Sequence, residues 1–338
     1  MSRIMTREFN RRETLLTIAG ALTAPLAGTS ALFAQTLDKS KPVRFLVGFP
    51  AGGSVDMVAR LVAEQLRADL GITAIVENIS GAGGRIAIER AKASAPDGST
   101  ILVTPAAMMT LYPLIFSKLN YDPIKDFIPV APLVTLEFSL IVTGAVPQDV
   151  KTLADLIAWY KANPSKGSYA HGSAGSPMHF IGAMLADHAK LDLTHIPYRG
   201  APPMLQDALS GQVAVAVTTV TDSLPHIQGG KLRAVAVSGK ERSKYLPDVP
   251  TFAEQGAAGI VVEDWFGMFV PAGTPMPIVE QLNAAISKAL TAPVIRERLT
   301  QLAYIPAGGS QGEFVKRLRA DIDKWTPVVK STGFRIEE

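Results

Sequence analysis

The stretch at residues 43–56, which reads V-R-F-L-V-G-F-P-A-G-G-S-V-D, constrains this chain more than any other. An apolar run of strand type ends at Phe49-Pro50, a glycine pair follows, and an amphipathic helix pattern begins after Ser54. A strand, a glycine turn and a helix in this order place free backbone N–H groups and a positive helix end at one point. Such a point attracts anions without a charged side chain, so we expect an anion site here.

The first 34 residues are typical of an export signal and are set apart from the fold. Four arginines make a basic start, an apolar run of small residues covers 15–32, and Ala34 before Gln35 is the expected cleavage point. The run is too short for a membrane span. Residues 10–16 resemble a twin-arginine signal, although Thr14 stands where such signals usually carry Phe. An ordinary export signal is the alternative, and either one predicts a periplasmic protein of a Gram-negative bacterium.

Charge and cysteine content exclude several classes of function. The formal net charge is +3, and the leader carries four arginines against two glutamates, which leaves +1 for the mature chain. That balance, with no run of Lys and Arg interleaved with aromatics, argues against nucleic acid as a partner. The absence of cysteine excludes disulfides, thiolate catalysis, cysteine-ligated zinc and a lipid on an N-terminal cysteine.

The mature chain alternates short apolar strands with helical patterns, which predicts an α/β fold. In the first half we expect strands at 43–49, 74–77 and 100–104, and helices at 55–70 and from the glycine turn 81–84 to 93. The pattern then restarts, with helices at 152–160, 178–188 and 202–209 and strands at 168–171, 193–197, 213–217 and 232–237. We therefore expect two α/β units whose glycine-rich turns face each other across a cleft and hold a carboxylate. The helical C-terminal part, 275–333, is expected to pack back on the first unit.

Two motifs suggest other chemistry, and each fails at one residue. The turn 81–84 is glycine-rich like a dinucleotide-binding turn, but Ile86 stands where the third glycine is needed. Ser173 lies between a strand and a helix like a hydrolase nucleophile, but His171 replaces the glycine two residues before it. His195 and His226 lie downstream as candidate acid–base partners, so a secreted serine hydrolase centred on Ser173 remains an alternative. We expect Ser173 to donate its hydroxyl to a ligand instead.

The histidines do not show a metal-binding pattern. Their spacings match neither H-x3-H nor H-E-x-x-H, and we expect neither a metal nor a cofactor. Only His179 is expected to reach a ligand, since it lies in the first turn of the helix that follows the Gly/Ser turn. The five histidines are His171, His179, His188, His195 and His226.

Three further positions have expected roles. Asp56 lies just inside the first helix, where a carboxylate favours the helix start and can accept hydrogen bonds from loop N–H groups. Arg85 is the cation beside the second glycine turn, and both a surface role and recognition of ligand charge stay open. Trp265 and Phe266 precede a strand-like run to Val270, and we expect them to pack in the core at the boundary between the units.

Eight short motifs follow one another along residues 41–333. They are K-P-V-R-F-L-V-G-F-P-A-G-G-S-V-D, V-E-N-I-S-G-A-G-G, A-P-D-G-S-T, Y-D-P-I-K-D-F, H-I-P-Y-R-G, L-P-H-I-Q-G-G-K-L-R-A-V-A-V, L-P-D-V-P-T and W-F-G-M-F-V-P-A-G-T-P. In their order over this length, the mature chain resembles the Bug-type (Bordetella uptake gene) periplasmic solute-binding proteins that serve tripartite tricarboxylate transporters.

The resemblance implies a two-lobed, flytrap-like periplasmic-binding-protein fold of type II, with two doubly wound lobes and a central cleft. Lobe 1 is expected at residues 35–138 and 265–338 and lobe 2 at 139–264, with crossing segments near 136–140 and 263–267. The implied function is capture of a small organic carboxylate and its delivery to the membrane components of the transporter. A sensor that acts through a receptor kinase is the alternative to transport. We expect a monomer that is not an enzyme.

The resemblance also implies that backbone N–H groups and bridging waters hold the ligand at the facing loops. The implied positions are Phe49, Gly52, Gly53 and Ser54 in the first loop, Gly172, Ser173, Gly175 and Ser176 in the second, and Thr104 and Ala106 at the cleft edge. Relatives often carry Asp-Asn where this chain has Thr218 and Thr219, and many carry Asn in place of Arg85. Loss of a carboxylate and gain of a guanidinium favour a more anionic or longer ligand. Mono-, di- and tricarboxylates and aromatic acids all remain open.

Overall fold

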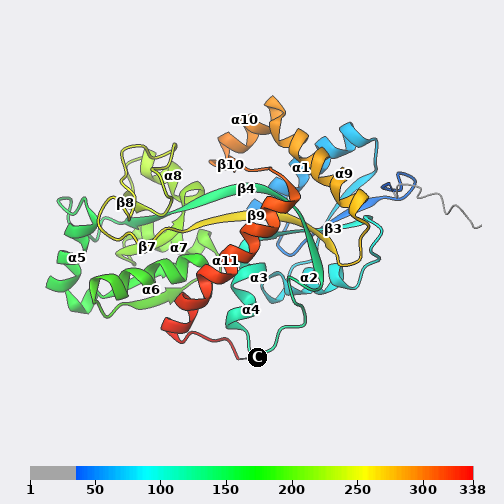
Figure 1. Cartoon of the computed structure of the whole chain (residues 1–338). Coiled ribbons are helices and arrows are strands. Elements are labelled where there is room, and N and C mark those ends of the chain that lie inside the picture. Colours follow the sequence, from blue (N-terminus) through cyan, green and yellow to red (C-terminus); the bar gives the residue numbers. More distant parts are fainter. Residues whose placement is uncertain (1–35, 338) are drawn as a thin grey trace, which may run out of the picture. The chain divides into compact units, whose positions relative to one another are not determined.

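The computed structural model describes residues 36–337 of the protein (Figure 1). The expected export signal at 1–34 and its cleavage point lie outside the described residues. Among residues 36–337, every helix is too short or too polar to span a lipid bilayer.

The strands of the sheet run in the order β2-β1-β3-β9-β4-β7-β5-β6, and β8 and β10 also pair with β4. They are β1 Val43–Val47, β2 Ala74–Asn78, β3 Thr100–Pro105, β4 Phe127–Val142, β5 Ser168–His171, β6 Thr194–Pro197, β7 Val215–Thr219, β8 Arg233–Val237, β9 Glu263–Pro271 and β10 Ile305–Pro306.

The first strand group consists of the parallel strands β2, β1 and β3 with their helices. Strand β1 is almost continuously apolar and buried, as expected of a parallel strand covered on both faces. Helix α1 (Ser54–Leu70) buries a stripe that includes Val58, Val62 and Leu66, and it ends at Gly71 in the left-handed conformation. It packs against β2 and against α9 (Met276–Thr291), while α2 (Arg85–Lys92) packs against β1 and β3. The group also contains η1 (Ala82–Gly84), α3 (Ala106–Thr110) and α4 (Tyr112–Ile115).

The second strand group consists of the parallel strands β7, β5 and β6 with their helices. Helix α6 (Pro177–Ala189) packs on all three strands. The first helix of the group begins with a capping box formed by Thr152 and Asp155. The remaining elements of the group are α5 (Leu153–Ala162), η2 (Pro164–Lys166), α7 (Ala201–Ser210) and α8 (Val220–Gln228).

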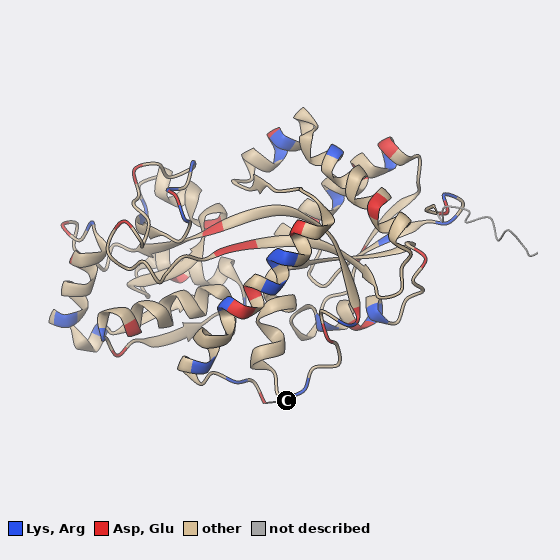
Figure 2. Cartoon of the chain, viewed as in Figure 1, with Lys and Arg blue, Asp and Glu red and all other residues tan. Residues whose placement is uncertain are grey.

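Strands β4 and β9 lie side by side and connect the two groups (Figure 1). Residues 127–137 of β4 pair with β9, and residues 138–142 pair with β7 and β8. The expected crossing segments fall where Glu137 of β4 lies opposite Glu263 of β9. Figure 2 shows acidic positions within β4 and at the start of β9, whereas charges of both signs are mixed along α11 (Gln311–Thr332).

The C-terminal helices close the core against both groups. Helix α9 covers α1, as predicted, with α10 (Pro293–Gln301) beside it, whereas α11 contacts α3, β4 and also α6 of the second group. Trp265 is fully buried, with its ring centroid 4.9 Å from that of Phe314 on α11, and its Nε1 donates to Asp321 at 2.7 Å. Trp265 and Phe266 are therefore core residues, as predicted.

Candidate functional site

A buried carboxylate fixes the loop after β1, residues 48–53. Asp56 accepts hydrogen bonds from the N–H of Gly52 (2.8 Å), Arg60 Nε (3.0 Å) and Asn78 Nδ2 (2.8 Å). Asn78 also donates to the carbonyl of Phe49 at 3.1 Å. Burial raises the pKa of Asp56, but these hydrogen bonds outweigh it and hold the pKa below its usual value. The helix-start role predicted for Asp56 is confirmed.

Helix α1 begins without a side-chain cap. Its N-cap is Gly53, in an extended conformation, and no side chain accepts a hydrogen bond from the first N–H groups. Ser54 is the first helical residue and is exposed. Since the first N–H groups of a helix have no intrahelical acceptor, this end attracts an anion. Gly53 and Ser54 thus lie at the kind of point that the sequence predicts.

The first loop and the second glycine turn are in direct backbone contact. A Cβ on Gly48 would lie 2.6 Å from the Cα of Gly84, closer than real Cβ contacts come. A Cβ on Gly84 would lie 3.4 Å from the ring of Phe49. The glycines at 48 and 84 are therefore needed for this close approach rather than for a nucleotide.

Arg85 is held beside the second glycine turn. Its Nε donates to the carbonyl of Ala82 at 2.9 Å, and its guanidinium carbon lies 4.2 Å from the centroid of the Phe116 ring. The guanidinium therefore belongs to the first group and lies close to the backbone of the turn.

The buried carboxyl group of Asp264 interacts with the backbone that follows β3. Thr104 is buried, and Ala106 begins α3 after Pro105. Asp264 of β9 accepts a hydrogen bond from the N–H of Trp265 at 2.8 Å and interacts with the N–H of Ala106. Burial raises the pKa of Asp264 to about 7 despite these two donors.

The second loop, residues 172–176, follows β5 and leads into α6. Ser176 is the N-cap of α6, no side chain caps the helix, and Pro177 is its first residue. The hydroxyl of Ser176 donates to the carbonyl of Ser173 at 2.6 Å, while Ser173 itself is exposed. Gly175 has a φ of +72°, and a Cβ on it would lie 2.6 Å from Cδ1 of Ile115. The second loop therefore packs against α4 of the first group.

Thr218 and Thr219 end β7 beside the second loop, because β7 and β5 are parallel neighbours. Thr219 caps α8: its hydroxyl accepts from the N–H of Asp222 at 3.1 Å. The hydroxyl of Thr218 is buried and has no hydrogen-bond partner among the described residues. Unlike Thr219, Thr218 thus holds an unused polar atom next to the loop.

The register of β4 brings the two sets of strand ends toward each other. Pro105 at the end of β3 lies opposite Phe266 of β9, and Phe266 lies opposite Val134 of β4. Thr219 at the end of β7 lies opposite Phe138 of β4. Val134 and Phe138 are four residues apart, or about 13 Å along a strand. The loops of both groups therefore converge on one short stretch of β4.

Tyr304 lies between these loops, and no sequence pattern singled it out. It comes directly before β10, which pairs with β4 at Val134 and Thr135, and it is buried. Burial raises its pKa to about 12, while the hydroxyls of Ser54 and Thr221 act in the opposite direction. Tyr304 is therefore in reach of the start of α1 and of the start of α8.

His179 faces a histidine cluster rather than an isolated ligand position. Its Nδ1 accepts from the N–H of Gly175 at 3.3 Å, and its ring centroid lies 5.0 Å from that of His171 and 4.2 Å from that of His195. Within the described residues, the hydroxyl of Ser173 contacts the carbonyl of Ala174 at 3.5 Å and no histidine. The structure thus gives Ser173 no acid–base partner of the hydrolase type.

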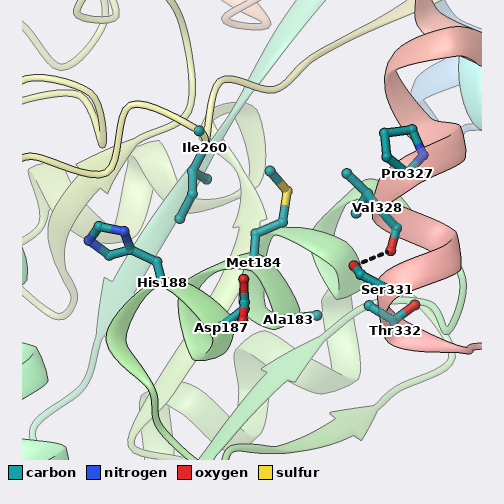
Figure 3. Close-up of a pocket in the computed structure, with 10 residues that line it drawn as sticks. Ala183, Met184, Asp187, His188, Ile260, Pro327, Val328, Ser331 and Thr332 are labelled. Carbon is teal, nitrogen blue, oxygen red and sulfur yellow. Dashed lines mark hydrogen bonds between the residues drawn. The ribbon is translucent and has the colours of Figure 1, made fainter.

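Two cavities of about 610 Å³ each lie beside α6, and the second one reaches His179 at the base of the second loop. The first lies between α6 and α11, where Met184 lies between Ile260 and Val328 and the His188 ring points away from α11 (Figure 3). The second shares Ala183, Ser331 and Thr332 with the first and extends to His179 and His195. Its lining consists of Tyr169, His179, Ala183, Ala186, Leu191, Asp192, Leu193, His195, Ser331, Thr332 and Phe334.

Comparison with known proteins gives the family. The sequence model of the tripartite tricarboxylate transporter family receptor matches residues 58–334. The chain belongs to this receptor family. BugT of Bordetella pertussis (strain Tohama I) is 31% identical over 324 residues, which cover 96% of this chain and 98% of BugT. The resemblance to Bug-type receptors is therefore confirmed.

Two solved structures are similar in fold and sequence. Rpa4515 of R. palustris with adipate is 30% identical with a TM-score of 0.79, covering 88% of this chain and 99% of that chain. MatC (Rpa3494) from Rhodopseudomonas palustris with bound malate is 33% identical with a TM-score of 0.74, covering 86% of this chain and 99% of that chain. They confirm the predicted α/β fold of two lobes and a cleft. The members of this receptor family are periplasmic solute-binding proteins and not enzymes.

Proposed function

We propose that this protein is a periplasmic receptor that captures a small organic carboxylate between its lobes and delivers it to a tripartite tricarboxylate-type transporter. The observation that carries the proposal is the pair of uncapped helix starts. Helices α1 and α6 both begin without a side-chain cap, and each follows a glycine-containing loop at the carboxyl end of a parallel strand. Because the strand ends of both groups converge along β4, one ligand can meet both loops.

Backbone N–H groups are the proposed ligand contacts. In the first loop they belong to Ser54 and Val55, with the Ser54 hydroxyl beside them, since the N–H of Gly53 donates to the carbonyl of Pro50. In the second they belong to residues 172–174, since the N–H groups of Gly175 and Ser176 donate to His179 and to the carbonyl of Ser173. The Ser173 hydroxyl is exposed at the loop. Ions held in this way need no charged partner, since the helix dipole and several N–H groups act together. Thr104, Thr218 and Thr219 complete the edge of the proposed site.

Closure of the lobes is the proposed switch that the transporter recognises. We assign residues 35–138 and 265–338 to lobe 1 and 139–264 to lobe 2, with the hinge where Glu137 lies opposite Glu263. A ligand that contacts both loops favours the closed arrangement by its differential affinity for it. The packing of Gly175 against Ile115 supports this, because it brings the second loop onto lobe 1.

A dicarboxylate is the ligand class to test first. Adipate and malate, named with two similar structures, each have two carboxyl groups. Two uncapped helix starts on opposite lobes offer one anion-attracting point to each end of such a molecule. Arg85 adds a positive charge beside the first loop, which favours an anionic ligand further.

A thermal-shift screen tests the proposal. The mature protein is unfolded, freed of any co-purified molecule, refolded and heated with mono-, di- and tricarboxylates and aromatic acids. A ligand that binds only the folded state raises the Tm in proportion to the logarithm of its concentration above the Kd. The diamide of each active diacid is the matched control and should leave the Tm unchanged. A well-folded protein whose Tm no carboxylate raises would contradict the proposal, and labelling of Ser173 by a fluorophosphonate would then favour the hydrolase.

A further inference from the structure

Three of the five histidines converge in the second lobe, although their spacing along the sequence matches no metal-binding motif. Strands β5 and β6 are parallel, with Tyr169 opposite His195. His171 lies two residues after Tyr169, so the side chains of His171 and His195 lie on the same face of the sheet. Helix α6 packs on both strands and adds His179 from its first turn. The cluster is therefore a product of the fold and not of local spacing.

The distances within the cluster suit one metal ion. One nitrogen from each ring lies within 4.8 Å of the other two, and His171 Nε2 is 3.1 Å from His195 Nδ1. Zinc–nitrogen bonds of about 2.1 Å in a tetrahedral site put ligating nitrogens roughly 3.4 Å apart and ring centroids roughly 5 Å apart. The three centroid separations are 4.2, 5.0 and 5.3 Å. The rings of His171 and His195 are nearly parallel, at 15°, so the rings must turn for the three nitrogens to converge on one ion.

The cluster holds lone pairs that the protein does not fully use. His171 is completely buried, and its Nδ1 has no hydrogen-bond partner among the described residues. Burial, with His179 and His195 nearby, lowers the pKa of His171 to about 3, against a weak opposite effect of the Ser173 backbone. Burial and then His195 lower the pKa of His179 to about 4.

The contacts inside the cluster can be exchanged for metal bonds. One proton lies between His171 Nε2 and His195 Nδ1, the two nitrogens that face each other. When both of these nitrogens ligate an ion, that proton moves to the other nitrogen of the ring that carried it. The hydrogen bond from Gly175 to His179 Nδ1 is long at 3.3 Å, and it is given up when His179 ligates through Nε2 with its proton on Nδ1. The ring of Phe334 covers the cluster, 4.6 Å from the His179 centroid.

The second cavity provides access for an ion and a position for a fourth ligand. It reaches His179 and His195 directly and has a volume of about 610 Å³, ample for a bound water. Three imidazoles with one open position are a known arrangement for zinc, whereas Ca²⁺ and Mg²⁺ require oxygen ligands. The chain has no cysteine that would add a thiolate.

We propose that His171, His179 and His195 form a binding site for a divalent transition-metal ion, and that Zn²⁺ is the ion that fits it best. The site lies at the base of the second loop, because His171 directly precedes Gly172 and His179 follows Ser176. The site adjoins the second loop, since the N–H of Gly175 donates to His179, but the proposal of a metal site does not rest on the proposed function.

Competition with a chromophoric chelator tests the site. The tag-free mature protein is stripped with EDTA, dialysed and titrated with Zn²⁺ alone. We expect one equivalent to bind tightly, and we expect His195→Gln to weaken binding by about 100-fold or more, since even partners that only orient a ligand account for about 10- to 100-fold. His195 is half-buried, so this variant should fold, whereas a change at the fully buried His171 would disturb the core. Circular dichroism in EDTA checks the fold of each variant.

His188→Gln is the matched control. His188 is also on α6 but lies at the neighbouring cavity between α6 and α11 (Figure 3), and its loss should leave Zn²⁺ binding unchanged. With Co²⁺ in place of Zn²⁺, the wild type should show the intense visible absorption of a tetrahedral nitrogen site, and His195→Gln should not. Failure of the wild type to bind Zn²⁺ stoichiometrically, or equal binding by wild type and His195→Gln, would overturn the proposal.

Discussion

The first and second loops reach the same stretch of β4, but they are stabilised by different chemistry. In the first loop a buried carboxylate, Asp56, joins the loop N–H of Gly52 to Arg60 and Asn78. The second loop is shaped by Gly175 and by a hydroxyl contact between Ser176 and Ser173, with neutral histidines behind it. Moreover, α6 begins with Pro177, which has no N–H, whereas α1 begins with Ser54, which has one. The comparison indicates a first loop that is rigid and rich in donors, and a second loop that adapts when the lobes close.

Replacing a glycine in each loop by alanine should give the largest difference in the free energy of unfolding. Gly48→Ala places a Cβ 2.6 Å from backbone at Gly84, so we expect a loss of about 3 kcal/mol or more in the free energy of unfolding. Gly175→Ala meets side chains rather than backbone, namely the end of Ile115 at 2.6 Å and the Phe334 ring at 3.3 Å, and its positive φ should cost about 1–2 kcal/mol. Gly144→Ala, in open space, is the control. Urea unfolding measures all three, and a smaller loss for Gly48→Ala than for Gly175→Ala would contradict the account.

Removal of the charge at Asp56 should loosen the first loop alone. Asp56→Asn keeps the size of the side chain but weakens the charge-assisted hydrogen bond from Arg60, so we expect a loss of about 2 kcal/mol in the free energy of unfolding. Amide hydrogen exchange should rise at residues 49–56 and stay unchanged at 172–176. The control is Asp187→Asn, which removes an ion pair with Lys190 that is exposed on both sides and should change neither measurement. Equal exchange at both loops would show that they are not stabilised separately.

Asp264 provides a pH test of the first lobe. Because its pKa in the folded protein is raised to about 7, the native state keeps a proton that the unfolded state loses near pH 4. Its contribution to stability is therefore present below about pH 4 and is lost as the pH rises to 7. In Asp264→Asn this loss, about 1.4 kcal/mol per pH unit, should disappear. Urea unfolding between pH 4 and 8 measures it, and an unchanged slope in the variant would argue against a protonated Asp264.

Arg85 and Thr218 should affect ligand preference rather than stability. Arg85→Ala removes a positive charge beside the first loop, so we expect affinity for a dianionic ligand to fall about tenfold relative to a monoanionic one. Thr218→Asp introduces a carboxylate next to the second loop and should disfavour dianions in the same direction. Isothermal titration at two ionic strengths measures both. If neither variant changes the affinity ratio, the hypothesis of a more anionic or longer ligand is wrong.

The sequence predicts the parts of the fold that follow local periodicity. Strand β5 matches its expected range of 168–171, and α1 matches to within one residue. The expected strand at 43–49 instead ends at Val47, because Gly48 is needed for contact with Gly84. The expected strand at 213–217 is shifted to Val215–Thr219, so that Thr218 and Thr219 belong to β7 itself.

The elements that the sequence did not reveal depend on tertiary pairing. Strand β4 contains Pro129 and Pro132 beside irregularities in its register, and prolines inside a run argue against a strand. Helix α8 contains Pro225, which hides its helical pattern. Tyr304 reaches the site only because β10 pairs with β4, and the histidine cluster requires two parallel strands and the helix above them. Only a signal between distant positions could have predicted these contacts.

The central claim is that backbone N–H groups at the start of α1 bind the carboxylate. Isothermal titration of wild type, Ser54→Ala and Ser54→Pro with the most active diacid from the screen tests it most directly. Proline is favoured at the first position of a helix and follows the extended Gly53 without strain, so Ser54→Pro removes the N–H and keeps the fold. We predict that Ser54→Ala binds within about threefold of wild type and that Ser54→Pro binds roughly 10- to 100-fold more weakly. Equal affinity of the alanine and proline variants would contradict the account.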